Sequence, residues 1–437
     1  MPSHPEPTLP EPRRPEPATG VQARRVLRNP KLWVVPGVLV GLLSLLMSLL
    51  YLGGILDPRA DLHDVPIALV NTDRGATVGG QQQNLGEQLL TGIATAPGQG
   101  DAVSWRRLDE ATAKEQLASG KLYGALQVPA DFTATVAALG ATSAEPARPT
   151  VVQYTNPGVG SLGSSLAAQI GQQAVHRASL HLGATLAALP QAQGAGNAAR
   201  LLIADPIAVS TTPGHPIGNR SGLGLTAFYY TLLLVLAGFM GANIIGNGVD
   251  VALGYADNEI GPWRARHPVV PINRTSTLAV KCAMSVVLSL LTSSLIMLAS
   301  VVILDMDAAH LPLLWVFSVC ATSAVGLGVQ AINAAFGGLG LLISMFVFIV
   351  LGLPSSGATI PLDALPSFYK FLALFEPMRQ LTDGVRAILF FDAQADAGLA
   401  RAWIWIAIGT VAALLFGFAM TRYYDRKGLH RAVPEIA

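Results

Sequence analysis

The chain has 437 residues, of which 51% are hydrophobic and 13% are charged. Soluble globular domains have about 25% charged residues, so this composition argues against an ordinary soluble protein. The net charge of +1 lacks the overall basic bias that nucleic-acid binding requires, and we expect no nucleic-acid partner. Two cysteines are too few for a disulfide framework.

Residues 1–31 form a tail with Pro-Glu-Pro repeats. Such a segment buries too little apolar surface to offset the entropy of ordering it, so we expect a disordered cytoplasmic tail. Arginines and a lysine between residues 24 and 31 precede the apolar run 32–53. This run is longer than the apolar core of a signal peptide, and no cleavage pattern follows it. It predicts an uncleaved first transmembrane helix.

Residues 54–221 differ in character because charges of both signs return and apolar residues come in short runs. Asp109 has the character of a helix N-cap, and Gly120 ends the same predicted helix. The alternation of strands and helices predicts a compact α/β domain inserted between the first two transmembrane helices. The predicted strands are 65–70, 102–108, 123–128, 151–154 and 206–211, and the predicted helices are 85–93, 110–119, 161–189 and one that begins at 129–132.

Residues 222–422 contain five further apolar runs. About 20 apolar residues let a helix cross the roughly 30 Å hydrocarbon core of a bilayer. We therefore predict a membrane α-helical protein with six transmembrane helices, a cytoplasmic loop at 247–281, a re-entrant outer segment at 354–391 and a cytoplasmic tail at 423–437. The five runs are 226–245, 283–304, 313–331, 339–353 and 402–420.

Basic residues predict the orientation. The segment before the first helix, the loop 247–281 and the C-terminal tail are all rich in lysine and arginine. Six spans place these three segments on one side, which the positive-inside rule makes cytoplasmic. Both termini are thus predicted in the cytoplasm, with the α/β domain outside a plasma membrane.

Three polar residues, Asn243, Gln330 and Asn333, stand near the ends of predicted spans. They either form interhelical hydrogen bonds or line a polar substrate path. The cores of the spans contain essentially no ionisable residue, whereas a proton-driven pump usually needs one. No phosphate-binding loop, metal-binding motif or nucleophile motif is present, so we expect no enzymatic activity and no cofactor or metal.

The cytoplasmic loop contains Trp263, Arg264, Arg266 and Arg274. Such a segment can lie along the membrane surface and offer a basic, tryptophan-anchored face to a soluble subunit. The alternative interpretation is a solvated loop whose charges only set the orientation.

Proline and glycine interrupt the outer segment 354–391, and its apolar runs at 368–375 and 381–391 are too short to span. Runs of this length predict re-entrant or interfacial helices. Helical spacing allows the pairs Glu376–Arg379 and Asp383–Arg386. The residues of this candidate outer gate are Gly357, Pro361, Pro366, Glu376, Pro377 and Arg386.

Two parts of the sequence resemble type-2 ABC exporter permeases. Residues 356–366, followed by 375–378 and Gly384-Val385-Arg386, are similar to the region before the last helix, which forms short outer-side helices in that family. Residues 264–281 resemble the cytoplasmic coupling region of the family, where the ATPase docks. In the outer domain, residues 67–76 (IALVNTDRGA) and 123–132 (YGALQVPADF) resemble segments of the phage-infection-protein (YhgE/Pip-like) subfamily.

The resemblance implies the permease subunit of an ABC-type export system. Two copies would form a path for a hydrophobic or amphipathic substrate, and a separate cytoplasmic ATP-binding subunit would supply the energy. Two alternatives stay open: a non-transporting receptor or secretion-apparatus scaffold that uses its outer domain to bind partners, and an ion-coupled efflux protein. Six helices exceed what an anchor needs, which ranks the permease first.

Overall fold

The computed structural model describes residues 30–53, 58, 61–78, 81–96, 102–139, 147–188, 197–260, 262–265, 267–429 and 431. The chain divides into two compact units, Met1–Gly53 and Gly54–Ala437. In the first unit, helix α2 runs from Pro30 to Gly53. Its 24 residues are long enough to cross a bilayer at roughly 1.5 Å per residue. The predicted disordered tail lies almost wholly outside the described residues.

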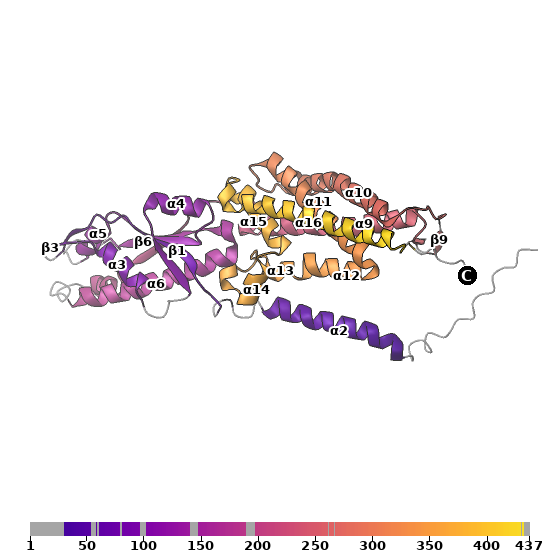
Figure 1. The fold of residues 1–437 in the computed structure, drawn as a ribbon. Helices are drawn as coiled ribbons and strands as arrows, with labels where there is room; N and C mark the ends of the chain where they lie inside the picture. Colours follow the sequence, from indigo (N-terminus) through magenta and orange to yellow (C-terminus); the bar gives the residue numbers. More distant parts are fainter. Residues whose placement is uncertain are drawn as a thin grey trace, which may run out of the picture. The chain divides into compact units, whose positions relative to one another are not determined.

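A five-stranded mixed sheet forms the centre of residues 61–220, which we call the sheet domain (Figure 1). The strand order is β4-β1-β5-β6-β7, and only the β5–β6 pair is antiparallel. In the register, Leu69 of β1 lies opposite Arg107 of β4 on one side and Leu126 of β5 on the other. The strands are β1 (Val65–Asn71), β4 (Val103–Arg107), β5 (Gly124–Val128), β6 (Thr150–Thr155) and β7 (Ala208–Pro213).

Helices cover both faces of this sheet. On one face, α3 (Leu85–Ala94), α5 (Phe132–Ala138) and α6 (Ser161–Ala187) bury a cluster around Leu126 and Val151. On the other face, α4 (Glu110–Ala118) packs Ala113 and Leu117 against Ala68 and Val70. These elements match the predicted strands and helices. The hairpin of β2 (Ala76–Val78) with β3 (Gln81–Gln83) and the helix α8 (Asn197–Ala204) were not predicted.

Asp73 organises the turn that follows β1. Its side chain is buried, with 8% exposed, and accepts hydrogen bonds from the backbone N–H groups of Gly75 (3.1 Å), Gly86 (3.0 Å) and Thr133 (3.2 Å) and from the Thr133 hydroxyl. One carboxylate therefore holds the first turns of α3 and α5 to the end of β1. Asn71 supports it by accepting the Asp73 N–H at 3.0 Å.

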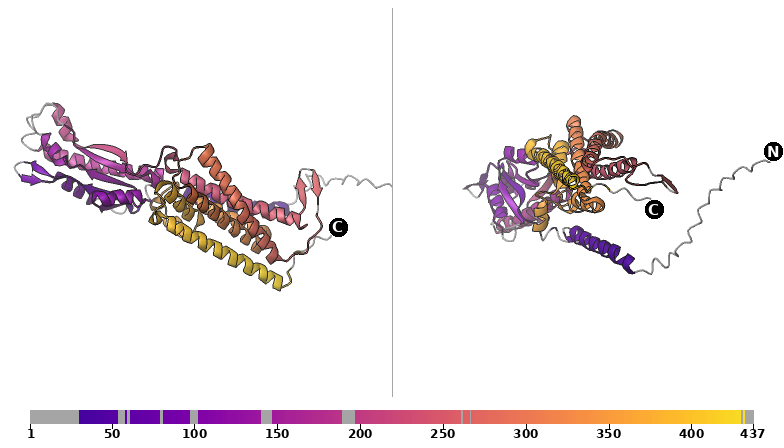
Figure 2. Two further views of the ribbon diagram at one scale, coloured as in Figure 1. Left: turned by 90° about the horizontal axis from the view of Figure 1, so that it is seen from above. Right: turned by 45° about the vertical axis from the view of Figure 1, so that its right-hand side comes forward.

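Four segments among the described residues are long and apolar enough to cross a membrane. They are Thr226–Ala252, Arg274–Ile303, Leu311–Ser355 and Leu399–Arg426. Figure 2 shows the helices α9, α10, α11 and α16 that form most of them. The bounds are α9 (Thr226–Ala252), α10 (Arg274–Met297), a π-helical turn Leu298–Ile303, α11 (Leu311–Phe336) and α16 (Leu399–Arg426). The loop predicted at 247–281 is shorter than expected, because helices occupy both of its ends.

The third segment, Leu311–Ser355, contains two predicted spans and reverses between them. Gly337 ends α11 with a φ of 58°, a conformation that glycine adopts without strain. The chain then returns through α12 (Gly340–Met345), a π-helical turn Phe346–Val350 and α13 (Gly352–Ser355). A Cβ at Gly340 would lie 2.6 Å from Asn333, and one at Gly328 would lie 2.6 Å from the Phe348 ring. The second leg therefore runs back against the first.

Helix α11 is the centre of the helical part and packs against α9, α10 and α16. Small residues permit α9 and α11 to approach closely. At Gly238 of α9 there is no room for a side chain, because a Cβ there would lie only 2.8 Å from the Thr322 carbonyl oxygen of α11. Hydroxyl pairs join the same helices, with Ser289 and Ser323 oxygens 2.6 Å apart. Such contacts are the usual basis of helix association inside a membrane, where apolar burial supplies little attraction.

We predict that Asp73→Ala destabilises the sheet domain by roughly 3 kcal/mol, because it leaves several buried donors without an acceptor. Thermal unfolding of the purified protein, followed by circular dichroism, measures the change. The matched control is Asp131→Ala, since Asp131 is exposed and makes no side-chain hydrogen bond at the start of α5. Equal stability of the two variants would contradict the role of Asp73.

Candidate functional site

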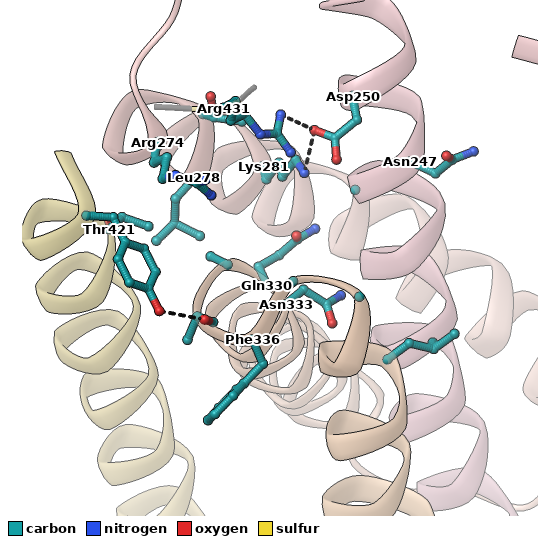
Figure 3. Close-up of a pocket in the computed structure, with 18 of the residues that line it drawn as sticks. Asn247, Asp250, Arg274, Leu278, Lys281, Gln330, Asn333, Phe336, Thr421 and Arg431 are labelled. Atoms are coloured by element: carbon teal, nitrogen blue, oxygen red, sulfur yellow. Dashed lines mark hydrogen bonds and ion pairs between the residues drawn. The ribbon is translucent and has the colours of Figure 1, made fainter. Parts of the chain in front are cut away.

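A cavity of about 890 Å³ lies where the C-terminal ends of α9, α11 and α16 meet the N-terminal end of α10 (Figure 3). The sheet domain contacts the opposite ends of the helices, for example where a Cβ at Gly218 would meet Asp307 beyond α10. We call this the inner cavity. Polar and charged residues line much of it, including Asn243, Asn247, Asp250, Arg274, Lys281, Gln330, Asn333 and Arg431.

One carboxylate in the inner cavity is shared by two cations. The Asp250 Oδ1 atom lies 2.8 Å from Lys281 Nζ and 2.6 Å from Arg431 Nη1 (Figure 3). The Lys281 side chain is only 13% exposed and Asp250 is 22% exposed. Removing water from these charges is unfavourable unless they are paired, which explains why they converge. Because one acid faces two bases, the cluster keeps a net positive charge.

The three predicted path residues come together at this cavity. Gln330 is 1% exposed, and its Nε2 donates to the Ala242 carbonyl at 2.9 Å and to Ser285 Oγ at 3.3 Å. Asn333 Nδ2 donates to Asn243 Oδ1 at 3.0 Å. These side chains therefore make interhelical hydrogen bonds and also line the cavity, and their role in a substrate path stays a prediction.

The candidate coupling residues fall in two places. Trp263 and Arg264 lie in β9 (Trp263–Ala265), which pairs with β8 (Asn258–Ile260) in a short hairpin. Trp263 is 78% exposed, and Arg264 forms ion pairs with Asp257 and Glu259. Arg266 lies outside the described residues.

Arg274 belongs instead to the inner cavity. It is the first residue of α10, and its Nε donates to the Leu429 carbonyl at 2.7 Å. Its guanidinium also lies 5.6 Å from the centre of the Tyr424 ring. Arg274 therefore ties the start of α10 to the C-terminal end of α16.

The candidate outer gate consists of short helices between α13 and α16. Pro361 precedes a 3-10 turn (Leu362–Ala364), and Pro366 precedes α14 (Ser367–Leu372). Glu376 caps α15 (Pro377–Phe390), accepting from Met378 N at 3.0 Å and Arg379 N at 2.9 Å, with Pro377 as the first helical residue. This carboxylate is 4% exposed. Burial raises its pKa to about 7, against the opposing effect of the two N–H donors and Arg379.

The ion pairs predicted in this segment are wrong. Glu376 binds the Arg379 backbone rather than its side chain. The Asp383 carboxylate pairs with Arg379, which lies one helical turn earlier in α15; Oδ2 and Nε are 3.5 Å apart. It forms no ion pair with Arg386. Arg386 instead donates to the carbonyls of Gly357 (3.3 Å) and Ala358 (3.0 Å). The helix-capping position of Glu376 and the inward direction of Arg386 explain both differences.

Sequence reasoning missed Asp250 and Arg431 as site residues. The run Gly246-Asn247-Gly248 resembles the end of a helix, whereas α9 continues to Ala252 and carries Asp250 into the cavity. Arg431 lies beyond the last span, and only its ion pair with Asp250 brings it to the site. Asp250 and Lys281 are also far apart in the sequence, and no local pattern indicates that they form an ion pair.

Comparison with known proteins gives one family and one distant structure. The sequence profile of a family described as "Protein of unknown function (DUF3533)" matches residues 37–409. A crystal structure described as a domain of an ABC type-2 transporter from Thermotoga maritima MSB8 is 17% identical, covering 33% of this chain and 83% of that one with a TM-score of 0.23. No curated protein matches.

We predict that Asp250→Asn lowers stability by roughly 2 kcal/mol, because Lys281 and Arg431 then face each other without a carboxylate; a fully buried pair would lose about 3–5 kcal/mol. The apparent melting temperature in detergent measures the loss. Asp250→Asn combined with Lys281→Met should recover part of it. Asp305→Asn, at a carboxylate that is 71% exposed, is the control and should change little.

The Glu376 carboxyl predicts a pH dependence of stability. Its pKa is raised from 4.5 to about 7, so the native state binds this proton more tightly than the unfolded state. The resulting stability is complete below pH 4.5 and is lost as the pH rises through 7, at roughly 1.4 kcal/mol per unit of pKa difference. Melting temperatures between pH 5 and 8 should fall less in Glu376→Gln than in the parent. Parallel curves would refute the assignment.

Proposed function

The chain belongs to the DUF3533 family, and we propose that this member is the permease subunit of an ABC-type export system. The observation that carries the proposal is the inner cavity, a cavity of about 890 Å³ that charged and amide side chains help to line, between the ends of helices long and apolar enough to span a membrane. A protein whose helices only anchor it in the membrane has no need of such a cavity. In this proposal the chain transports and catalyses no reaction itself.

The proposed topology has six spans with both termini in the cytoplasm. The reversal at Gly337 supports two passes within Leu311–Ser355, and α2 supplies a helix of spanning length. The basic residues Arg274, Lys281 and Arg431 gather at the inner cavity, and the positive-inside rule favours the cytoplasm for that end. The sheet domain then lies outside the plasma membrane, because it contacts the opposite helix ends.

The proposed energy source is a separate cytoplasmic ATP-binding subunit. The hairpin of β8 and β9 presents an exposed Trp263, and exposed aromatic residues are common anchors of protein interfaces. Two copies of the chain would enclose a path for a hydrophobic or amphipathic substrate between the inner cavity and the outer segment 354–391. The narrower phage-infection-protein assignment rests on the sequence resemblance of residues 67–76 and 123–132 alone.

One observation favours a second candidate, an ion-coupled efflux protein. Asp250 is a partly buried carboxylate on a helix of spanning length, the type of residue that carries protons in pumps. Its two basic partners favour the charged form, which makes proton transfer harder and ranks this candidate lower. Loss of export on collapse of the proton gradient, with ATP maintained, would select it.

We predict that Trp263→Ala combined with Arg264→Ala prevents an ATP-binding subunit from co-purifying with the full-length protein, while membrane insertion is unchanged. The protein is affinity-purified from native membranes, and bound subunits are identified by mass spectrometry and by ATP hydrolysis. Lys114→Ala, which removes an exposed cation of the sheet domain, is the control. An ATP-binding subunit retained by the double variant would exclude the hairpin as the docking site.

A further inference from the structure

Arg386 is buried without a carboxylate partner. It is 8% exposed, and its two Nη groups donate only to the carbonyls of Gly357 and Ala358. Its Nε meets no acceptor. Within the described part of the chain no carboxylate forms an ion pair with it, since Asp383 lies next to Arg379 instead. The charge of Asp383 favours the charged form of Arg386 from a distance, but a buried cation without a direct ion pair is unfavourable.

A cavity of about 510 Å³ opens beside this arginine, a size typical of small-molecule sites. It lies at the joint of the sheet domain and the helices, and both contribute residues to it. Lys121 and Tyr123 come from the sheet domain, whereas Arg386 lies on α15 and Arg401 on α16. We call it the joint cavity.

The charges of the joint cavity do not balance. Four basic side chains (Lys121, Arg379, Arg386 and Arg401) and three acidic ones (Asp363, Asp383 and Asp396) line it. Asp396 forms an ion pair with Lys121 at 2.5 Å, and Asp383 forms one with Arg379 at 3.5 Å. Asp363 interacts with the Tyr123 hydroxyl. Burial raises the pKa of Tyr123, and the negative charge of Asp363 raises it further. Arg386 and Arg401 are therefore the two cations that the described residues leave without an ion pair.

We propose that the joint cavity binds a ligand with one oxyanion group, a phosphate or phosphodiester, held by Arg386 and Arg401. The planar guanidinium fork matches phosphate oxygens, and an anion matches the excess positive charge of the lining residues. Because residues of the sheet domain and of the helices line the same cavity, a bound ligand stabilises the joint. The site is independent of the transport function proposed above.

Two sources supply such a group: a soluble phosphate compound, or the headgroup of a phospholipid. The exposed phenylalanines of α14, Phe368 and Phe371, are residues with which interfacial helices contact a membrane surface, which favours access for a phospholipid headgroup. The same measurement distinguishes them when each source is supplied separately.

The test measures the melting temperature of the purified full-length protein in a neutral detergent. Inorganic phosphate is titrated against chloride at constant ionic strength, and short-chain phosphatidylglycerol is titrated in a second series. A saturable increase with phosphate identifies a soluble ligand, and an increase with the lipid alone identifies a headgroup. Either supports the site, provided that Arg401→Gln raises the apparent dissociation constant at least tenfold.

Arg386→Gln should abolish the increase, and Arg401→Gln decides the question if the first variant does not fold, because Arg401 is only partly buried. Lys114→Gln, at an exposed residue of α4 away from the cavity, should leave the titration unchanged. No increase with either compound, or an increase of equal affinity in Arg401→Gln, overturns the proposal.

Discussion

The ring of Phe391 couples the sheet domain to the helices, and two glycines make room for it. A Cβ at Gly120 would lie 2.8 Å from the ring, and one at Gly158 would lie 2.9 Å from it. Either side chain would force the ring out, because a packed interior does not yield at such distances. The neighbouring His215 Nε2 hydrogen-bonds the Phe390 carbonyl at 2.7 Å. A movement of α15 is therefore transmitted directly to the sheet domain, which no flexible linker would allow.

The sequence predicts the elements of the sheet domain well because each has a local signal. Asp109 caps α4 through a bond to Thr112 N, and Gly120 follows its end with a φ of 70°. The hairpin of β2 and β3 has no apolar alternation, since β3 is Gln81-Gln82-Gln83, and it escaped prediction for that reason. The sheet order is likewise absent from any local pattern, because β1 pairs with β4 and β5 rather than with β2.

The candidate site is less predictable because its contacts join distant residues. Polar character alone identified Asn243, Gln330 and Asn333, which do meet at the inner cavity. Charge character alone did not place the charged residues: Arg274, predicted to couple to an ATPase, contacts Tyr424 and Leu429, and Asp250 was placed in a loop. In the outer segment, helical spacing permitted the pair Asp383–Arg386, yet Arg379 has the better geometry at one full turn.

The two cavities differ in how their buried cations are partnered. In the inner cavity Asp250 forms ion pairs with both Lys281 and Arg431, which connect α9 to α10 and to the chain beyond α16. Arg386 in the joint cavity donates only to carbonyl oxygens, and the proposed oxyanion would supply its counter-charge. Buried ion pairs contribute little net stability but favour one arrangement over others. Lys281 and Arg431 therefore find their carboxylate partner within the chain, whereas Arg386 would find its partner in the oxyanion that we propose.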